Sequence, residues 1–225
     1  MMAQIIDRKR LKAEMRELLR SAQVSPRGMA AMYLLLSLSL STVAGFTGLA
    51  GGLLGTFASI LSSLIDVVLA AGFVMYCMAI RRGERAEYLT LFDGFSFAGK
   101  IILLTIITDL FIILWSTLFF IPGIIAAYRY RMAIYLLVDD PSRGVMECIR
   151  LSREMMKGHK WELFVLDLSF IGWNLLAMLP VIGYAVQIWS MPYINLTYAL
   201  YFENRSGRDI YAAQSGAVPP PWEFQ

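Results

Sequence analysis

The sequence predicts an all-α, polytopic integral membrane protein, with six transmembrane helices arranged as three hairpins and additional amphipathic cytoplasmic helices. Of its 225 residues, 58% are hydrophobic and only 16% are charged. An average soluble chain is about 45–50% apolar and about 25% charged. The charged residues also cluster, which leaves three long apolar blocks separated by basic segments. These observations argue against a water-soluble enzyme and exclude an intrinsically disordered chain.

Residues 1–25 form the first predicted unit, an amphipathic helix that precedes the apolar blocks. Ile5, Leu11 and Leu18 recur near one face at helical spacing, and the basic side chains lie off that face. Such a helix can lie in the membrane interface with its basic side against anionic lipid headgroups. The same pattern also fits a helix that packs on cytoplasmic loops.

The first apolar block covers residues 28–80. Asp66 is its only acidic or basic residue, and the block is long enough for two spans of about 20 residues each. Four glycines between residues 48 and 55 mark the tip of this first hairpin. Their spacing would let two helices approach closely, and it is equally typical of a flexible external loop.

The second and third apolar blocks cover residues 101–138 and 161–202. Each is about two spans long, and each carries proline near its centre, at Pro122 and Pro180. Because proline ends or kinks helices, these positions predict the two remaining hairpin tips. Pro192 falls inside the sixth predicted span, where it would kink the helix.

Basic residues set the predicted topology. Outside the spans, every Lys and Arg precedes residue 28, follows residue 202, or lies in the linkers 81–100 and 139–160. Such segments belong on the cytoplasmic side, so both termini are expected there. A single long helix over residues 101–138 would give five spans and place the second basic linker outside, against this rule. The membrane domain is therefore expected to cover residues 26–203, followed by a flexible cytoplasmic tail, 204–225.

The second linker predicts a cytoplasmic helix. Asp140 and Pro141 are typical of a helix start, and Gly158 is well placed to end the helix. Val145 and Ile149 recur at helical spacing between them. This helix could pack on the protein, lie on the membrane or bind a partner protein.

Ionisable residues inside the predicted spans are the main functional candidates, because a charge there persists only when it is paired, hydrated or needed. At 1.5 Å per residue, Asp109 and Arg129 both lie about 12–13 Å from the inner ends of their spans, and Arg131 and Asp167 both about 9–10 Å. We therefore predict the ion pairs Arg129–Asp109 and Arg131–Asp167. The pairs either hold helices together, or the arginines line an inward-facing cavity for an anionic solute or headgroup. Asp66 has no basic partner at its depth.

Several kinds of site are not expected. Sequence motifs for a catalytic nucleophile, a phosphate-binding loop or a metalloprotease are absent, so neither catalytic residues nor cofactors are predicted. One histidine and two separated cysteines give no metal site. The basic loops are explained by topology, so nucleic acid is not an expected partner.

A family resemblance adds to this interpretation. The stretches that carry it are Arg82-Gly83-Glu84, residues 91–95, residues 121–125, Asp139-Asp140-Pro141, residues 152–161, residues 166–173 and Met191-Pro192-Tyr193. With them the chain resembles bacterial polytopic membrane proteins of domain-of-unknown-function family 975. The resemblance implies a multi-pass protein of the bacterial cytoplasmic (inner) membrane and no known reaction. It also marks Asp167 and the junction motif Lys157-Gly158-His159-Lys160-Trp161.

These observations predict a non-enzymatic membrane scaffold or accessory subunit that contacts anionic lipids, a partner membrane protein or further copies of itself. The alternative is a small transporter or pore protomer for an anionic solute or lipid, with Arg129 and Arg131 in its cavity.

Overall fold

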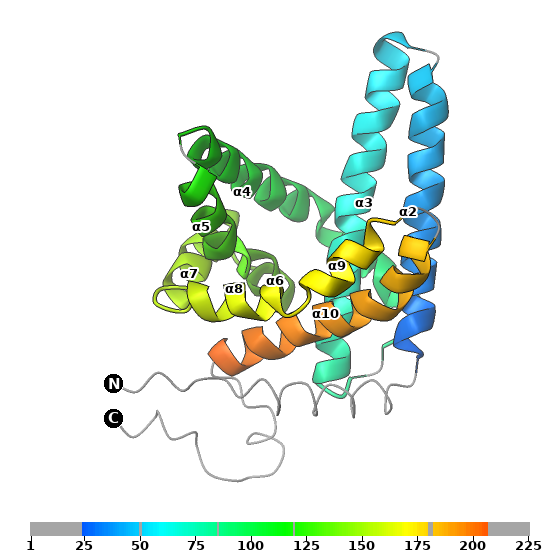
Figure 1. Ribbon diagram of the computed structural model, residues 1–225. Helices are drawn as coiled ribbons and strands as arrows, with labels where there is room; N and C mark the ends of the chain where they lie inside the picture. Colours follow the sequence, from blue (N-terminus) through cyan, green and yellow to red (C-terminus); the bar gives the residue numbers. More distant parts are fainter. Residues whose placement is uncertain (1–23, 50, 85, 119, 180–181, 207–225) are drawn as a thin grey trace, which may run out of the picture.

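The computed structural model describes residues 24–206, except for residues 50, 85, 119 and 180–181 (Figure 1). Every regular element in these residues is a helix, as the sequence predicts. The elements are α2 (Pro26–Leu49), α3 (Gly52–Arg81), η1 (Tyr88–Phe97), α4 (Ala98–Leu118), α5 (Phe120–Tyr130), α6 (Ala133–Asp139), α7 (Val145–Met155), α8 (Lys160–Leu168), α9 (Ile171–Ala177) and α10 (Ile182–Ser206).

Helices α2 and α3 form a long antiparallel hairpin that stands upright in Figure 1. Gly51 and Gly52 at its tip have φ values of 70° and 73°, which side chains other than glycine rarely adopt. A Cβ on Gly55 would lie 2.5 Å from the carbonyl oxygen of Thr47, so α3 begins in close contact with α2. The glycines thus serve the turn between the helices and, as one of the two alternatives predicted, their close packing.

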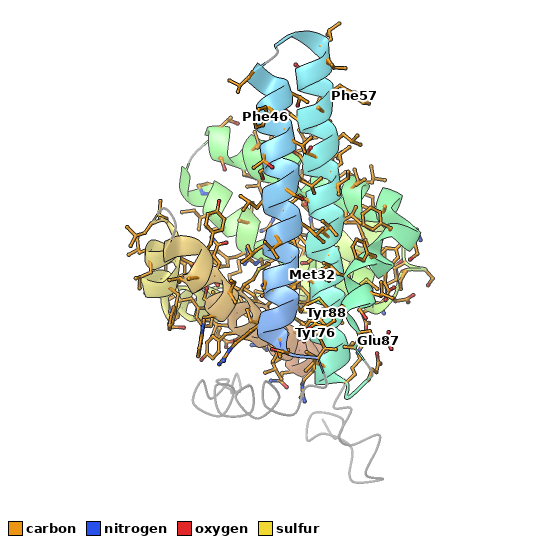
Figure 2. The ribbon with its side chains drawn as sticks, turned by 90° about the vertical axis from the view of Figure 1, so that its right-hand side faces the viewer. Met32, Phe46, Phe57, Tyr76, Glu87 and Tyr88 are labelled. Carbon is orange, nitrogen blue, oxygen red and sulfur yellow. The ribbon has the colours of Figure 1, made fainter. Side chains whose placement is uncertain are left out.

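The upper half of this hairpin exposes apolar side chains. Phe46 and Phe57 point away from the helix pair near its tip, and they are 79% and 66% exposed (Figure 2). Near the other end, the Tyr76 hydroxyl donates to the carbonyl oxygen of Val24 at 2.8 Å. An apolar surface of this extent suits lipid and not water. The core of the protein therefore surrounds only the lower half of the hairpin.

Three helical stretches are long and apolar enough to cross a membrane: Pro26–Leu49, Gly52–Arg81 and Tyr88–Thr117. The third one joins η1 to α4. Together with the exposed apolar surface, these stretches mark the chain as a membrane protein. Among the described residues these three stretches have the length and composition of a span, and six spans remain a prediction.

The second and third apolar blocks are divided into more and shorter helices than the sequence predicts. Helix α4 leans away from the hairpin, and α10 crosses the lower part of the hairpin and packs on both α2 and α3 (Figure 1). The 11 residues of α5 and the 9 of α8 are followed by the still shorter α6 and α9. Pro122 lies in the first turn of α5, where a missing N–H costs little. Pro192 lies inside α10, as predicted, and Pro180 falls outside the described residues.

Element η1 packs on α3 through an unusually close backbone contact. A Cβ on Gly72 would lie 1.9 Å from the carbonyl oxygen of Leu91, so only glycine fits at this crossing. Leu91 is fully buried, whereas Leu89 and Phe92 point outward. Part of the first linker, 81–100, is therefore an ordered helical element.

The predicted linker helix is present as α7, but it starts later than expected. It begins at Val145, because the Asp140 side chain accepts a hydrogen bond from the backbone N–H of Ser142 at 3.1 Å and forms a turn there. Gly158 follows the helix with φ 79°, which fits its predicted role. At the C-terminal end, α10 continues to Ser206, past the expected boundary at 203. The amphipathic helix predicted within 1–25 and most of the tail lie outside the described residues.

Candidate functional site

Asp167 is the centre of a polar cluster that joins three helices. Its carboxylate accepts a hydrogen bond from the Tyr128 hydroxyl on α5 at 2.9 Å and another from the Tyr198 hydroxyl on α10. The guanidinium of Arg131 lies over the Tyr198 ring, 4.7 Å from its centroid. Arg131 and Asp167 therefore share Tyr198, and they do not form the direct ion pair that depth predicted. Their proximity was predictable, but the intervening tyrosine was not.

Asp109 and Arg129 are not brought together. Asp109 is exposed on α4, and the structure forms no ion pair between the two side chains. Arg129 lies toward α7 and α8: its carbonyl oxygen accepts a hydrogen bond from Ser152 at 2.9 Å, and its positive charge, after burial, helps to lower the pKa of Lys160. The predicted pairing is wrong because equal depth does not fix the direction in which a side chain leaves its helix.

Asp66 meets α2 across the first hairpin. Its carboxylate lies close enough to Tyr33 of α2 for the two groups to interact electrostatically. One carboxylate oxygen, Oδ1, is buried and has no hydrogen-bond partner among the described residues.

An ion network, here called the basal network, joins the ends of the helices at the base of the molecule. It consists of Arg81, Arg82, Asp139, Arg143 and Glu203. Arg81 Nε lies 3.0 Å from Glu203 Oε2, and Arg82 reaches both Glu203, at 3.5 Å, and Asp139. Arg143 lies 3.9 Å from Asp139 Oδ2. Both carboxylates are 2% exposed, so the network joins α3, α6, the turn after α6, and α10 in a buried setting.

The junction motif lies beside this network. Gly158 turns the chain between α7 and α8, and His159 faces the end of α10. Arg205 contacts the His159 ring, with Nη1 3.1 Å from Nε2, and also donates to Glu162. Trp161 is 71% exposed and stacks on Phe164. The motif thus divides its side chains between the base and the outer surface.

A pocket of about 470 Å³ opens between the junction motif and the basal network. We call it the basal pocket. Its lining includes residues of the junction motif and of the basal network, together with Glu154 and Arg205. Its ionisable side chains are mostly basic and include Asp139, Arg143, Glu154, Lys157, His159 and Arg205.

A smaller pocket, of about 180 Å³, lies between α4 and the α5–α6 turn. Arg131 is the charged residue of its described lining, and Thr105, Thr108 and Tyr130 add hydroxyl groups. The remaining described lining is aliphatic. A single cation beside hydroxyl groups and an aliphatic wall could hold a small anion.

Comparison with known proteins places the C-terminal part of the chain in a family. A family model described as "Protein of unknown function (DUF975)" matches residues 117–209. Residues 117–209 belong to this family. No curated protein and no solved structure matches the chain. The family resemblance is therefore confirmed for this region, while Arg82-Gly83-Glu84 and residues 91–95 lie outside it.

The DUF975 region contains the Asp167 cluster, the junction motif and most of both pockets. The basal network extends beyond it, because Arg81 and Arg82 come from the first hairpin. Sequence reasoning missed Glu203, Asp139 and Arg205 as candidates. Asp139 was assigned to a linker and Arg205 to the tail, and Glu203 is the last residue of the expected membrane domain, just after an apolar block. Their signal was their position, since charges of both signs at the ends of apolar blocks can meet at one membrane surface.

No group of three or more potential metal ligands occurs among the described residues. Cys148 is fully buried on α7, and burial raises the pKa of its thiol, so it is poorly suited to nucleophilic chemistry. Among the features described above, the two pockets with their charged side chains are the candidate ligand-binding sites.

Proposed function

We propose that this chain is a non-enzymatic, six-span protein of the bacterial inner membrane that acts as a scaffold or accessory subunit by contacting anionic lipids or a partner membrane protein. The observation that carries the proposal is the division of α7 into two faces. Cys148, Ile149 and Ser152 are buried against the protein. Arg150 and Arg153 are exposed, as is Met146.

A helix with this division suits a membrane surface. Its cations would meet anionic headgroups, each contributing about 1 kcal/mol near the surface, and Met146 would reach the apolar boundary. The contact needs α7 on the cytoplasmic side, where anionic lipid and basic linkers meet. Both termini belong on that side in the same topology, and a second copy of the chain is one partner that the exposed apolar hairpin could accept.

Lipid retention tests the proposed contact. We expect the double variant R150Q/R153Q, purified in mild detergent, to retain several-fold less anionic lipid by mass spectrometry than the unmodified protein. Glu147 is exposed on the same helix, so E147Q is the matched control and should retain as much or more. Equal lipid retention in R150Q/R153Q and the unmodified protein contradicts the proposal.

Thiol labelling tests the topology separately. With Cys77 and Cys148 replaced by alanine, Glu147→Cys should react with a membrane-impermeant maleimide in inverted vesicles and not in intact cells. Labelling in intact cells would place α7 outside and remove the basis for the lipid contact.

The alternative is a transporter or pore protomer for an anionic solute or lipid. The smaller pocket, which Arg131 lines, favours this alternative. Arg131 lies beside the Asp167 cluster, and the Nε of nearby Arg129 is buried without a hydrogen-bond partner among the described residues. Saturable anion uptake into proteoliposomes, lost in R131Q and kept in R153Q, would support transport and overturn the scaffold proposal. Absence of such uptake, with correctly folded protein, would leave the scaffold.

A further inference from the structure

The charged side chains of the basal pocket differ in whether they already have partners. Asp139 is paired with Arg82 and Arg143, and Arg205 is paired with Glu162. Lys157 and Glu154 also line the pocket, and neither forms an ion pair within the described part of the chain. Both are exposed. The pocket therefore offers one cation and one carboxylate that are available to a ligand.

The rest of the pocket narrows the class of ligand. Arg143 and Arg205 reinforce the positive charge around Lys157, so a group with several acceptor oxygens is favoured over a single hydroxyl. The apolar part of the lining is formed by Leu136, Leu151, Met155 and Phe202. A volume of about 470 Å³ is within the range of small-molecule sites and exceeds what inorganic phosphate alone would fill.

We propose that the basal pocket binds a phosphate ester whose alcohol carries a hydrogen-bond donor, either an ammonium or a hydroxyl group. The phosphoryl oxygens accept hydrogen bonds from Lys157 and from the neighbouring guanidinium groups. The donor on the alcohol binds the Glu154 carboxylate. The aliphatic carbons contact the apolar wall. A lipid headgroup such as phosphoethanolamine or phosphoglycerol has this chemistry, and so does a soluble phosphate ester.

This site is separate from the lipid contact proposed for α7. Arg150 and Arg153 do not line the pocket, whereas Lys157 and Glu154 do. Loss of ligand binding in the basal pocket can therefore be measured while the lipid contact through Arg150 and Arg153 is intact.

Binding is tested with the full chain in phosphatidylcholine nanodiscs, because choline provides no hydrogen-bond donor. The soluble probes are phosphoethanolamine, glycerol 1-phosphate and inorganic phosphate, measured by calorimetry. The lipid probe is phosphatidylethanolamine added to the nanodiscs and measured by native mass spectrometry. We expect saturable binding of at least one ester, with inorganic phosphate weaker. Binding of soluble esters without the lipid identifies a soluble ligand, and binding of the lipid identifies a headgroup.

Three single variants decide the assignment of residues. K157Q should weaken ester binding about tenfold, the expected loss of one charge-assisted hydrogen bond. E154Q should weaken the esters and leave inorganic phosphate unchanged or tighter. E147Q removes an exposed charge from α7 outside the pocket, and should bind at least as tightly as the unmodified protein does. No saturable binding of any ester, or equal losses in K157Q and E147Q, would overturn the proposal, provided that the unfolding temperatures agree.

Discussion

The basal network allows a quantitative test through Glu203→Gln. Glu203 and Arg81 are 2% and 6% exposed, and their side chains lie 3.0 Å apart. Removing one member of a buried ion pair costs about 3–5 kcal/mol, because arginine stays charged and loses its counter-ion. Burial also raises the pKa of the Glu203 carboxyl, even beside Arg81 and Arg82, so the carboxylate itself bears a desolvation cost that glutamine relieves. We therefore expect E203Q to lower the free energy of unfolding by about 3 kcal/mol, the lower end of this range.

Thermal unfolding in detergent, followed by tryptophan fluorescence, measures this loss. For a chain of this size, 3 kcal/mol corresponds to a decrease in Tm of about 6–12 °C. The matched control is E147Q, at an exposed position with no ion pair among the described residues, which should change stability by less than about 0.5 kcal/mol. The reasoning is refuted if E203Q is as stable as the unmodified protein or more so. Desolvation of the carboxylate would then outweigh its attraction to the arginines.

Three further outcomes follow from particular contacts. Gly72→Ala should destabilise the protein by about 1–3 kcal/mol or more, because its Cβ would overlap the Leu91 carbonyl oxygen, while Gly99→Ala, with open space around it, should not lower the Tm. Asp167→Asn should cost about 1–2 kcal/mol in the same assay, because an amide cannot accept both tyrosine hydroxyls with the same strength. Cys148 should resist maleimide at pH 7 in the folded protein, because its raised pKa lowers the thiolate fraction, and rapid labelling would contradict its burial.

The sequence was most informative where solvent preference decides the structure. The long apolar stretch in which Asp66 is the only acidic or basic residue predicted the α2–α3 hairpin. An apolar segment of about 20 residues or more matches the thickness of a bilayer. The helical spacing of Val145 and Ile149 predicted α7 for a similar reason, since one face must be buried. Both inferences use only local pattern, and both elements are present.

Contacts between distant segments were harder to predict. Depth placed Arg131 near Asp167, and the structure agrees, but depth alone also paired Arg129 with Asp109, which face different neighbours. The direction of a side chain around its helix depends on how neighbouring helices tilt, and α4 leans away from the hairpin (Figure 1). The contact between Tyr198 and Asp167 could not be predicted from the sequence. The ring of a tyrosine suits a lipid-facing position, and its hydroxyl suits a carboxylate equally well.

The base of the molecule shows why charges collect where helices end. A buried carboxylate such as Glu203 is costly, and arginines at the ends of neighbouring helices can provide its counter-ions. The ends of α3, α6 and α10 therefore meet at one level, and the basal network binds them there. Asp139 and Arg143 belong to this network and also line the basal pocket. An anion in the pocket would compete with Asp139 for Arg143, so a bound ligand would act on the same contacts that hold the three helices together.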